Sequence, residues 1–258
     1  MSESVPKERL APKIIQPDWP APKRVRALVT TRQGGVSQAP FDSWNMGGHV
    51  QDDQDAVAQN RQLLNQFLPN NSQVCWLQQV HGVELIEATS ENLQAQADAS
   101  YSKASNQVCV IMTADCLPVL FCDLEGTQVA AAHAGWRGLA DSVLLKTLSS
   151  FDQTENVIAW MGPAISKAHF EVGQEVKEAF ADYPEAFVSS ERQGYFLADL
   201  YAIARQQLLN AGIKAVYGGE FCSYEQEDLW FSYRRATHQK VDQSATGRMA
   251  SCIWLESE

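Results

Sequence analysis

Histidine, cysteine and positive charge are all scarce in this chain. Its 258 residues include 5 His and 6 Cys, and 20 Lys and Arg stand against 31 Asp and Glu, which gives a net charge of −11. A surface that binds nucleic acid or an anionic membrane needs clustered Lys and Arg. We therefore expect neither nucleic acid nor a membrane as a partner, and any anionic ligand must be a small one held in a local basic pocket.

Long apolar runs and cysteine pairs are also missing. No stretch approaches the roughly 18 apolar residues of a membrane span, and residues 1–24 lack the apolar centre of a signal peptide. The cysteines form no CxxC pair and no dense framework, which is typical of reduced thiols rather than of disulfides. These features predict a cytoplasmic protein. They leave its oligomeric state open.

The remaining composition is that of an ordinary globular protein. With 45% hydrophobic and 20% charged residues, the chain can bury a sizeable core. Residues 1–24 are rich in Pro and charge and are interpreted as an arm or sheet edge, and residues 25–258 as one domain. In residues 33–36 a glycine turn is expected, with positive φ at Gly34 and Gly35.

Apolar periodicity predicts a mixed α/β fold. Short continuous apolar runs are typical of strands buried on both faces, and runs with apolar residues on one face are typical of helices. The expected strands are 25–31, 74–88 with a break near His81, 108–113, 117–123, 127–133, 156–162 and 213–219. The expected helices are 52–68, 138–151, 170–183 and 198–212, with caps at Asp52 or Asp53 and at Asp199, and residues 236–248 are expected to be a loop.

The segment "IMTADCLPVLFCD" carries a carboxylate and a thiol, Asp115 and Cys116, inside an apolar run. Both groups are costly to bury without partners. His81 and His133 each close an apolar run beside a glycine, and strand ends are where α/β proteins build their sites. Two His and one Cys suit Zn²⁺ with an open fourth position. The alternative is that these are ordinary core histidines and a buried thiol.

A metal at this place would define the chemistry. Zn²⁺ lowers the pKa of water towards about 7, and Asp115 could orient a ligand or act as a general base. Asp115 could also be a simple turn carboxylate. Two other hypotheses remain. In one, Cys116 is a nucleophile with His133 as its base, and in the other, zinc is a structural metal that stabilises the fold.

Two arginine patterns indicate an anion site. In "HAGWRGL", Gly135 and Gly138 allow close backbone approach and Arg137 could clamp a phosphate, although a tight turn with a surface arginine is the alternative. A second pattern, "FSYRR" with "TGRMAS", supplies a cluster of three: Arg234, Arg235 and Arg248. Surface ion pairing is the commoner role of such arginines.

Several motifs together resemble one bacterial family. "WLQQVHG", "TADCLPVLFCD", "AAHAGWRGL", "WMGPAIS" and "FSYRR…TGRMAS" occur in the order found in the laccase-domain or polyphenol oxidase family, also called the purine nucleoside phosphorylase and peptidoglycan editing factor family. The resemblance covers about residues 32–255. It implies a layered α/β/β/α domain with mixed sheets, and a metal held by His81, Cys116 and His133, with zinc usual and copper also described.

The same resemblance implies an activity and a pocket. Family members are assigned phosphorolysis of adenosine, inosine and methylthioadenosine, together with adenosine deamination, so nucleoside and phosphate are the expected partners. Motifs near the N-terminus imply that Arg32, Asn45 and Arg61 line the pocket. The chain departs from the family at Trp44 and Met46, where leucine is usual, and in a longer segment between residues 235 and 246.

Alternative activities follow from the same ligands. A zinc amidase that edits nucleotide-linked muramyl precursors carrying a wrong amino acid would use the same metal. Laccase-type oxidation fits poorly, because a multicopper oxidase needs many more histidines than the five present. Any phenol oxidation would come from a single copper bound in place of zinc.

Overall fold

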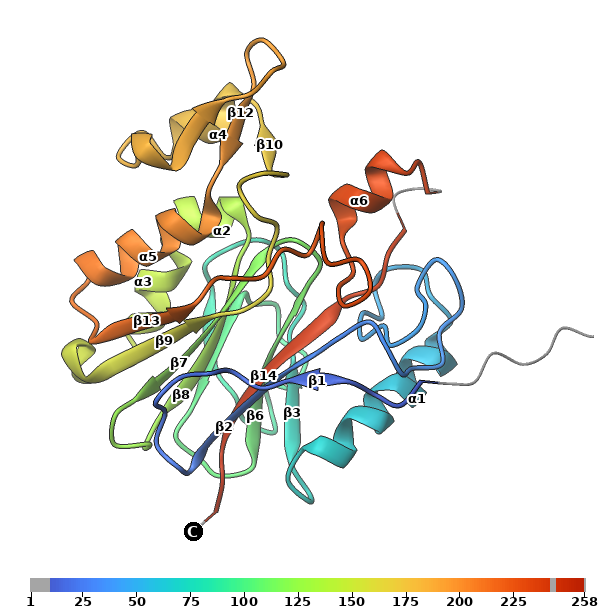
Figure 1. Ribbon diagram of the computed structural model, residues 1–258. Helices are drawn as coiled ribbons and strands as arrows, with labels where there is room; N and C mark the ends of the chain where they lie inside the picture. The colour runs from blue at the N-terminus through green and yellow to red at the C-terminus, as the bar shows by residue number, and fades with distance from the viewer. Residues whose placement is uncertain (1–9, 242–244, 258) are drawn as a thin grey trace, which may run out of the picture.

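The protein consists of two large β-sheets stacked face to face, with helices on their outer faces (Figure 1). The computed structural model describes residues 10–241 and 245–257. The first nine residues of the predicted arm lie outside this part. Parallel and antiparallel strand pairs occur in both large sheets. The expected mixed, layered α/β/β/α architecture is therefore confirmed.

The first sheet has five strands within the described residues. Their spatial order is β1 (Ile14–Ile15), β2 (Val25–Thr30), β14 (Met249–Leu255), β6 (Gln107–Thr113) and β3 (Gln73–Trp76). Strand β1 pairs with β2 through Ile14 and Thr30. Part of the predicted N-terminal arm is thus the edge of this sheet.

The second sheet has six strands in the described part of the chain. Their order is β13 (Ala215–Gly218), β9 (Val157–Met161), β7 (Leu117–Asp123), β8 (Val129–Ala134), β5 (Ala99–Ser102) and β4 (Leu85–Glu87). A small third sheet, β10 (Glu171–Val172), β12 (Phe196–Ala198) and β11 (Phe187–Ser189), carries α4 (Gln174–Ala179).

Helices cover the outer faces of both large sheets (Figure 1). The five-stranded sheet is covered by α1 (Gln54–Leu64), which continues as a short 3₁₀ turn, Asn65–Phe67. The six-stranded sheet is covered by α2 (Trp136–Ala140), α3 (Val143–Leu148) and α5 (Leu200–Asn210). Helix α6 (Tyr233–His238) lies apart from both layers. Within the described residues, no helix has the length and apolar character needed to cross a bilayer.

Strand alternation explains why the apolar runs are continuous. In β7, Leu120 faces the core between the two sheets, whereas Val119 and Phe121 face the helices outside. In β6, Ile111 faces the inner core and Val110 packs under α1. Each sheet is buried on both faces, so neither face of these strands needs polar residues.

Some predicted elements differ from the observed ones. The predicted helix 138–151 is broken at Ser142, whose φ of 73° is left-handed and incompatible with a continuous helix. The predicted helix 170–183 begins as strand β10, because Glu171 and Val172 pair with β12. The predicted loop 236–248 begins within α6; its residues 242–244 lie outside the described part.

Local caps and turns agree better with expectation. Asp53 caps α1 and Asp199 caps α5 through their side chains. Gly34 has a φ of 97°, as predicted, but Gly35 does not share it. A Cβ atom on Gly35 would lie 2.2 Å from the Ser43 carbonyl oxygen, so close packing explains this glycine.

The chain passes from the first large sheet to the second at two places, and the candidate functional site lies where it does so. The apolar segment 111–123 is two strands: β6 ends at Thr113 in one sheet and β7 begins at Leu117 in the other. Likewise, β3 belongs to the first sheet and β4 to the second. Asp115, Cys116 and His81 therefore lie in loops at the same edge of the two-sheet stack.

Candidate metal centre

The three predicted ligands come together at this edge. The His81 Nε2 and Cys116 Sγ atoms are 3.7 Å apart. The rings of His81 and His133 are 4.7 Å apart between centroids and meet edge to face. The potential ligand atoms of all three lie within 4.8 Å of one another. His133 is 3% exposed, whereas His81 faces solvent.

Sheet register explains the convergence. Strands β7 and β8 are antiparallel, with Leu117 opposite Ala134 and Pro118 opposite His133. The residue before β7, Cys116, therefore stands beside the end of β8. The third ligand, His81, is in the loop between β3 and β4 and has a left-handed φ of 62°. Strained non-glycine residues of this kind cluster at functional sites.

Two glycines make room for the cluster. A Cβ atom on Gly135 would lie 2.7 Å from His81 Cδ2 and 3.2 Å from Cys116 Sγ. A Cβ on Gly138 would lie 2.7 Å from the carbonyl oxygen of Gly82. The sequence predicted that these glycines let the backbone approach a bound anion closely; in the structure, the groups beside them are the candidate metal ligands and the loop of Gly82.

Asp98 holds both histidine segments in place. It is fully buried, and its Oδ1 is 2.8 Å from His133 Nδ1 and accepts the His81 backbone N–H at 2.9 Å. Its Oδ2 accepts the N–H groups of Val80 at 3.1 Å and Gly82 at 2.7 Å. A carboxylate on Nδ1 leaves Nε2 free for a metal and fixes the ring orientation.

The charges within the cluster support ligand formation. Burial raises the pKa of Asp98, but hydrogen bonds from His133 and from the Gly82 and Val80 backbone outweigh it and lower the pKa overall. Burial also opposes ionisation of Cys116, yet His133 and His81 lower its pKa to about 6. Conversely, burial lowers the pKa of His133, but Cys116 and Asp98 raise it to about 9. Each group thus favours the charged form of the other, the imidazolium of His133 and the thiolate of Cys116.

This donor set fits a borderline-soft divalent ion. One thiolate and two imidazoles are zinc ligands, and three protein ligands leave a position open. Copper binds the same ligand types. Because His81 is exposed, a metal ion can reach the cluster from solvent. Among the described residues, a second group of potential ligands consists of His169, Cys222 and Glu225.

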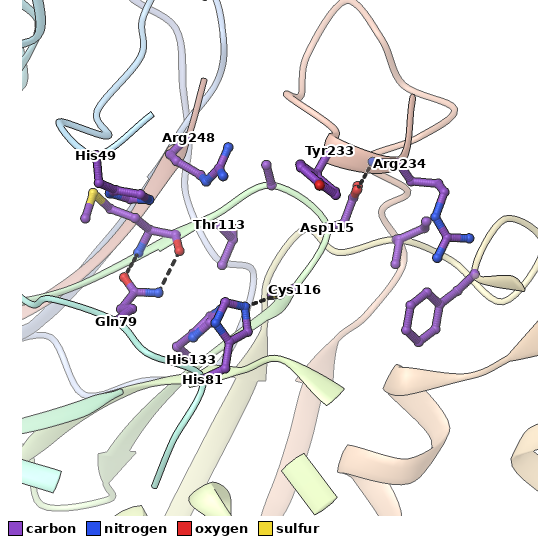
Figure 2. A pocket seen from close by; sticks show the side chains of 14 residues that line it. His49, Gln79, His81, Thr113, Asp115, Cys116, His133, Tyr233, Arg234 and Arg248 are labelled. Carbon is purple, nitrogen blue, oxygen red and sulfur yellow. Dashed lines mark hydrogen bonds between the residues drawn. The ribbon is translucent and has the colours of Figure 1, made fainter. Parts of the chain in front are cut away.

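The cluster forms the floor of a pocket of about 330 Å³ (Figure 2). Its wall is largely apolar and carries a few polar groups. Besides the three candidate ligands, the pocket is lined by Gln79, Met112, Thr113, Ala114, Ile165, Phe170 and Tyr233. The side chains of His49, Asp115, Arg234 and Arg248 complete the lining. An apolar pocket with a few convergent polar groups is typical of a small-molecule site.

Asp115 lines the pocket but both of its oxygens are engaged. Its Oδ1 accepts from Ser223 Oγ at 2.7 Å. Its Oδ2 accepts from the Arg234 backbone N–H, also at 2.7 Å (Figure 2). Its φ of 94° is strained, and these bonds hold the crossing loop in that shape. Asp115 thus anchors the loop that carries Cys116, whereas the carboxylate bonded to the His133 ring is Asp98.

Four other predicted residues lie outside the pocket lining. Arg32 bonds to the Asp42 and Glu227 carbonyls. Arg61 donates twice to the Met46 carbonyl and lies over the Trp76 ring. Arg137 is exposed and lies over the neighbouring Trp136 ring. The fourth is Asn45, which is fully buried.

Asn45 acts on the pocket indirectly. Its Oδ1 accepts the backbone N–H of Arg248 at 2.8 Å. Of the predicted arginine cluster, Arg234 and Arg248 both line the pocket, with Arg248 beside His49 (Figure 2). The third member, Arg235, is buried against the carbonyls of Ser223 and Trp230. The sequence motif therefore identified a supporting residue rather than a pocket residue.

Sequence reasoning missed two members of the site, Asp98 and His49. Asp98 is a lone carboxylate between Ala97 and Ala99, and its burial depends on the pairing of Ala99 with Ala132. His49 follows two glycines in a loop, and the rarity of histidine was the available signal.

Comparison with known proteins finds a family model and several proteins that are similar to this chain over almost its whole length. Residues 26–256 match the model of the family described as multi-copper polyphenol oxidoreductase laccase. A purine nucleoside phosphorylase of Pseudomonas aeruginosa is 51% identical over 94% of this chain and 98% of its own length. The purine nucleoside phosphorylase YfiH of Escherichia coli is 49% identical over 94% of this chain and 99% of its own length.

Solved structures agree. A Neisseria meningitidis protein has a TM-score of 0.87 at 46% identity, covering 95% of this chain and 99% of its own. The YlmD protein of Geobacillus stearothermophilus has a TM-score of 0.82 at 29% identity, covering 93% of this chain and 94% of its own. Family match, sequence identity and fold agree over almost the whole length, and the chain belongs to the laccase-domain family that includes these purine nucleoside phosphorylases.

Proposed function

We propose that this protein is a metal-dependent purine nucleoside phosphorylase acting on adenosine, inosine and methylthioadenosine. In this reaction an oxygen of inorganic phosphate forms a bond to ribose C1′ while the bond from C1′ to the purine nitrogen breaks. The bonding pair leaves with the purine, which takes up a proton from hydrogenphosphate or water. The site must therefore hold an anion and a flat heterocycle side by side.

The observation that carries the proposal is the free edge of the Arg248 guanidinium. Its Nη1 donates to the carbonyls of Thr246 and Gly247 at 2.9 and 3.1 Å. Within the described residues, its Nε and Nη2 have no protein partner, and the side chain lines the pocket. Burial lowers the pKa of Arg248, which reflects an incompletely solvated cation. A phosphate oxygen would satisfy these donors.

Neighbouring groups suit the rest of a nucleoside. Partial burial, Arg248 and Arg61 lower the pKa of His49. This favours the neutral imidazole, which donates from one nitrogen and accepts at the other. Met112, Ile165 and Phe170 supply apolar surface for a purine.

The three candidate ligands would add a metal ion to the site. His81, Cys116 and His133 would hold the ion, with zinc the proposed metal and copper the alternative. When bound, such an ion supplies a Lewis acid that polarises an oxygen atom. Asp98 would keep the His133 ring in its ligand orientation and the His81 backbone in place, and the apolar wall would limit the entry of water.

Adenosine deamination is the second candidate, because two His and one Cys also match the zinc deaminases. Those enzymes use a free carboxylate to move protons. The pocket carboxylate, Asp115, already accepts bonds through both oxygens. The pocket therefore supports phosphorolysis better than deamination.

Amidase and oxidase activities have less support. A nucleotide-linked muramyl precursor would extend far beyond a pocket of about 330 Å³. Multicopper oxidation needs a cluster of histidines, and of the five in the chain two lie in this centre.

Phosphate dependence tests the proposal. The purified enzyme is incubated with adenosine or inosine, with and without phosphate, and products are identified by mass spectrometry. We expect free base and ribose 1-phosphate only with phosphate, and a KM for phosphate at least tenfold higher in Arg248→Met. Arg192→Met, which removes an exposed arginine stacked on Tyr195, is the control. Phosphate-independent formation of inosine from adenosine would instead support deamination.

A further inference from the structure

A second group of metal-binding side chains lies outside the pocket lining. His169, Cys222 and Glu225 bring a nitrogen, a sulfur and a carboxylate oxygen within 4.8 Å of one another. His169 Nε2 is 2.7 Å from Glu225 Oε1. A surface ion pair would account for these two residues, but not for the buried thiol beside them.

The turn that carries two of these groups is rigid. The Cys222 N–H donates to Gln226 Oε1 at 2.9 Å, and the Gln226 N–H donates to the Cys222 carbonyl at 3.0 Å. Arg235 Nη1 donates to the carbonyls of Ser223 and Tyr224 at 2.7 and 2.8 Å. Because these bonds close the turn at both ends, the backbone of Cys222 and Glu225 is held in place before any ligand binds.

The third group is held from another direction. The His169 ring stacks on the Tyr224 ring, with 4.3 Å between centroids and 16° between planes. Tyr224 is fixed in turn by a 2.9 Å bond between its hydroxyl and His238 Nδ1. Arg234 Nη1 donates to the His169 carbonyl at 3.3 Å. The imidazole of His169 is thus oriented with its Nε2 towards Glu225.

The sulfur has the environment of a ligand. Cys222 Sγ accepts the Glu225 backbone N–H at 3.4 Å, and such bonds stabilise a thiolate in metal sites. The side chain of Cys222 is 5% exposed, whereas those of His169 and Glu225 are 28% and 57% exposed. Metal can therefore reach the site from solvent, and water can complete its coordination.

We propose that His169, Cys222 and Glu225 form a second metal site for a zinc-type ion. Sulfur, imidazole and carboxylate are all zinc ligands, and the net charge of −11 favours cations near the surface. The site braces the pocket wall, because Ser223, inside the turn, donates to Asp115 in the loop that carries Cys116.

Metal stoichiometry tests the proposal without any enzyme assay. Full-length protein is loaded with zinc, dialysed against a weak chelator and analysed for bound metal. We expect two ions in the wild type, one in Cys116→Ala, one in Cys222→Ser and none in the double variant. Glu220→Gln, an exposed neighbour outside the cluster, should retain two. Cobalt loaded into Cys116→Ala should show sulfur-to-metal charge-transfer absorption that Cys222→Ser removes.

A milder variant guards against misfolding. Glu225→Gln changes an exposed side chain and should weaken zinc binding to the second site at least tenfold in the Cys116→Ala background. One ion in the wild type and none in Cys116→Ala would overturn the proposal. So would zinc affinity that is equal in Glu225→Gln and Glu220→Gln.

Discussion

Asp98 offers the sharpest test of how the metal centre is held together. Its two oxygens accept four bonds, from His133 and from the backbone N–H groups of Val80, His81 and Gly82. In Asp98→Asn, one oxygen becomes an NH₂ group, so two of these donors face another donor. Asp98 is fully buried, and each unsatisfied buried donor costs about 1–3 kcal/mol. The metal-free variant should lose about 2–6 kcal/mol of unfolding free energy.

Metal affinity should fall as well. Removing a carboxylate that orients a metal-binding histidine typically costs about 10–100-fold in affinity, which is about 1.4–2.8 kcal/mol. The assay is zinc competition against a chromogenic chelator, with urea unfolding of the metal-free protein alongside.

A matched control separates orientation from general damage. Asp52 is also a buried aspartate, and its oxygens accept from Ser37, Asn45 and Asp53. Asp52→Asn should lose stability but keep its zinc affinity. Zinc affinity within threefold of wild type in folded Asp98→Asn would refute the role assigned to this carboxylate.

Three further predictions concern the same centre. Gly135→Ala should lower zinc affinity at least tenfold, because the new methyl group would lie 2.7 Å from His81 Cδ2; a folded variant with full affinity would contradict the packing argument. In metal-free protein, alkylation of Cys116 should rise with pH around a midpoint near 6, since its pKa is lowered to about 6 by His133 and His81 against the effect of burial, and zinc should protect it; a midpoint near 9 would contradict the thiolate pair. Cys75 and Cys109, whose pKa values burial raises to about 11 and 12, should stay unlabelled in the same mass-spectrometric experiment.

The sequence brought forward the three candidate metal ligands because their signal is local. Each stands at the end of an apolar run, where a histidine or thiol needs a partner, and the family resemblance selected these three. Asp98 has no such signal. Its role depends on the register of β5 against β8 and on a loop from the other sheet, and both are long-range pairings that the sequence does not reveal.

The family motifs were less informative about roles. Arg32, Asn45 and Arg61 occur in characteristic motifs, yet their side chains bond to backbone carbonyls and neighbouring side chains of the loops that surround the pocket. A family motif therefore includes residues that stabilise the fold as well as residues that line the site. Trp44 and Met46, where the chain departs from the family, are fully buried under the five-stranded sheet and lie outside the pocket lining.

The predicted elements failed where tertiary pairing decided the outcome. Strand β14 was not predicted, although all seven residues of Met249–Leu255 are buried and six of them are apolar, because the polar segment before it suggested a tail. It lies between β2 and β6, in the middle of the first sheet. Helix 138–151 had the right periodicity, but Ser142 breaks it into two.

The central claim is that the centre formed by His81, Cys116 and His133 carries the activity. The most direct measurement compares zinc content and phosphate-dependent cleavage of adenosine in the wild type and in Cys116→Ala, with circular dichroism to establish folding. The account predicts a folded variant that has lost zinc from this centre and forms neither free base nor ribose 1-phosphate. Turnover at the wild-type rate in that variant would contradict it.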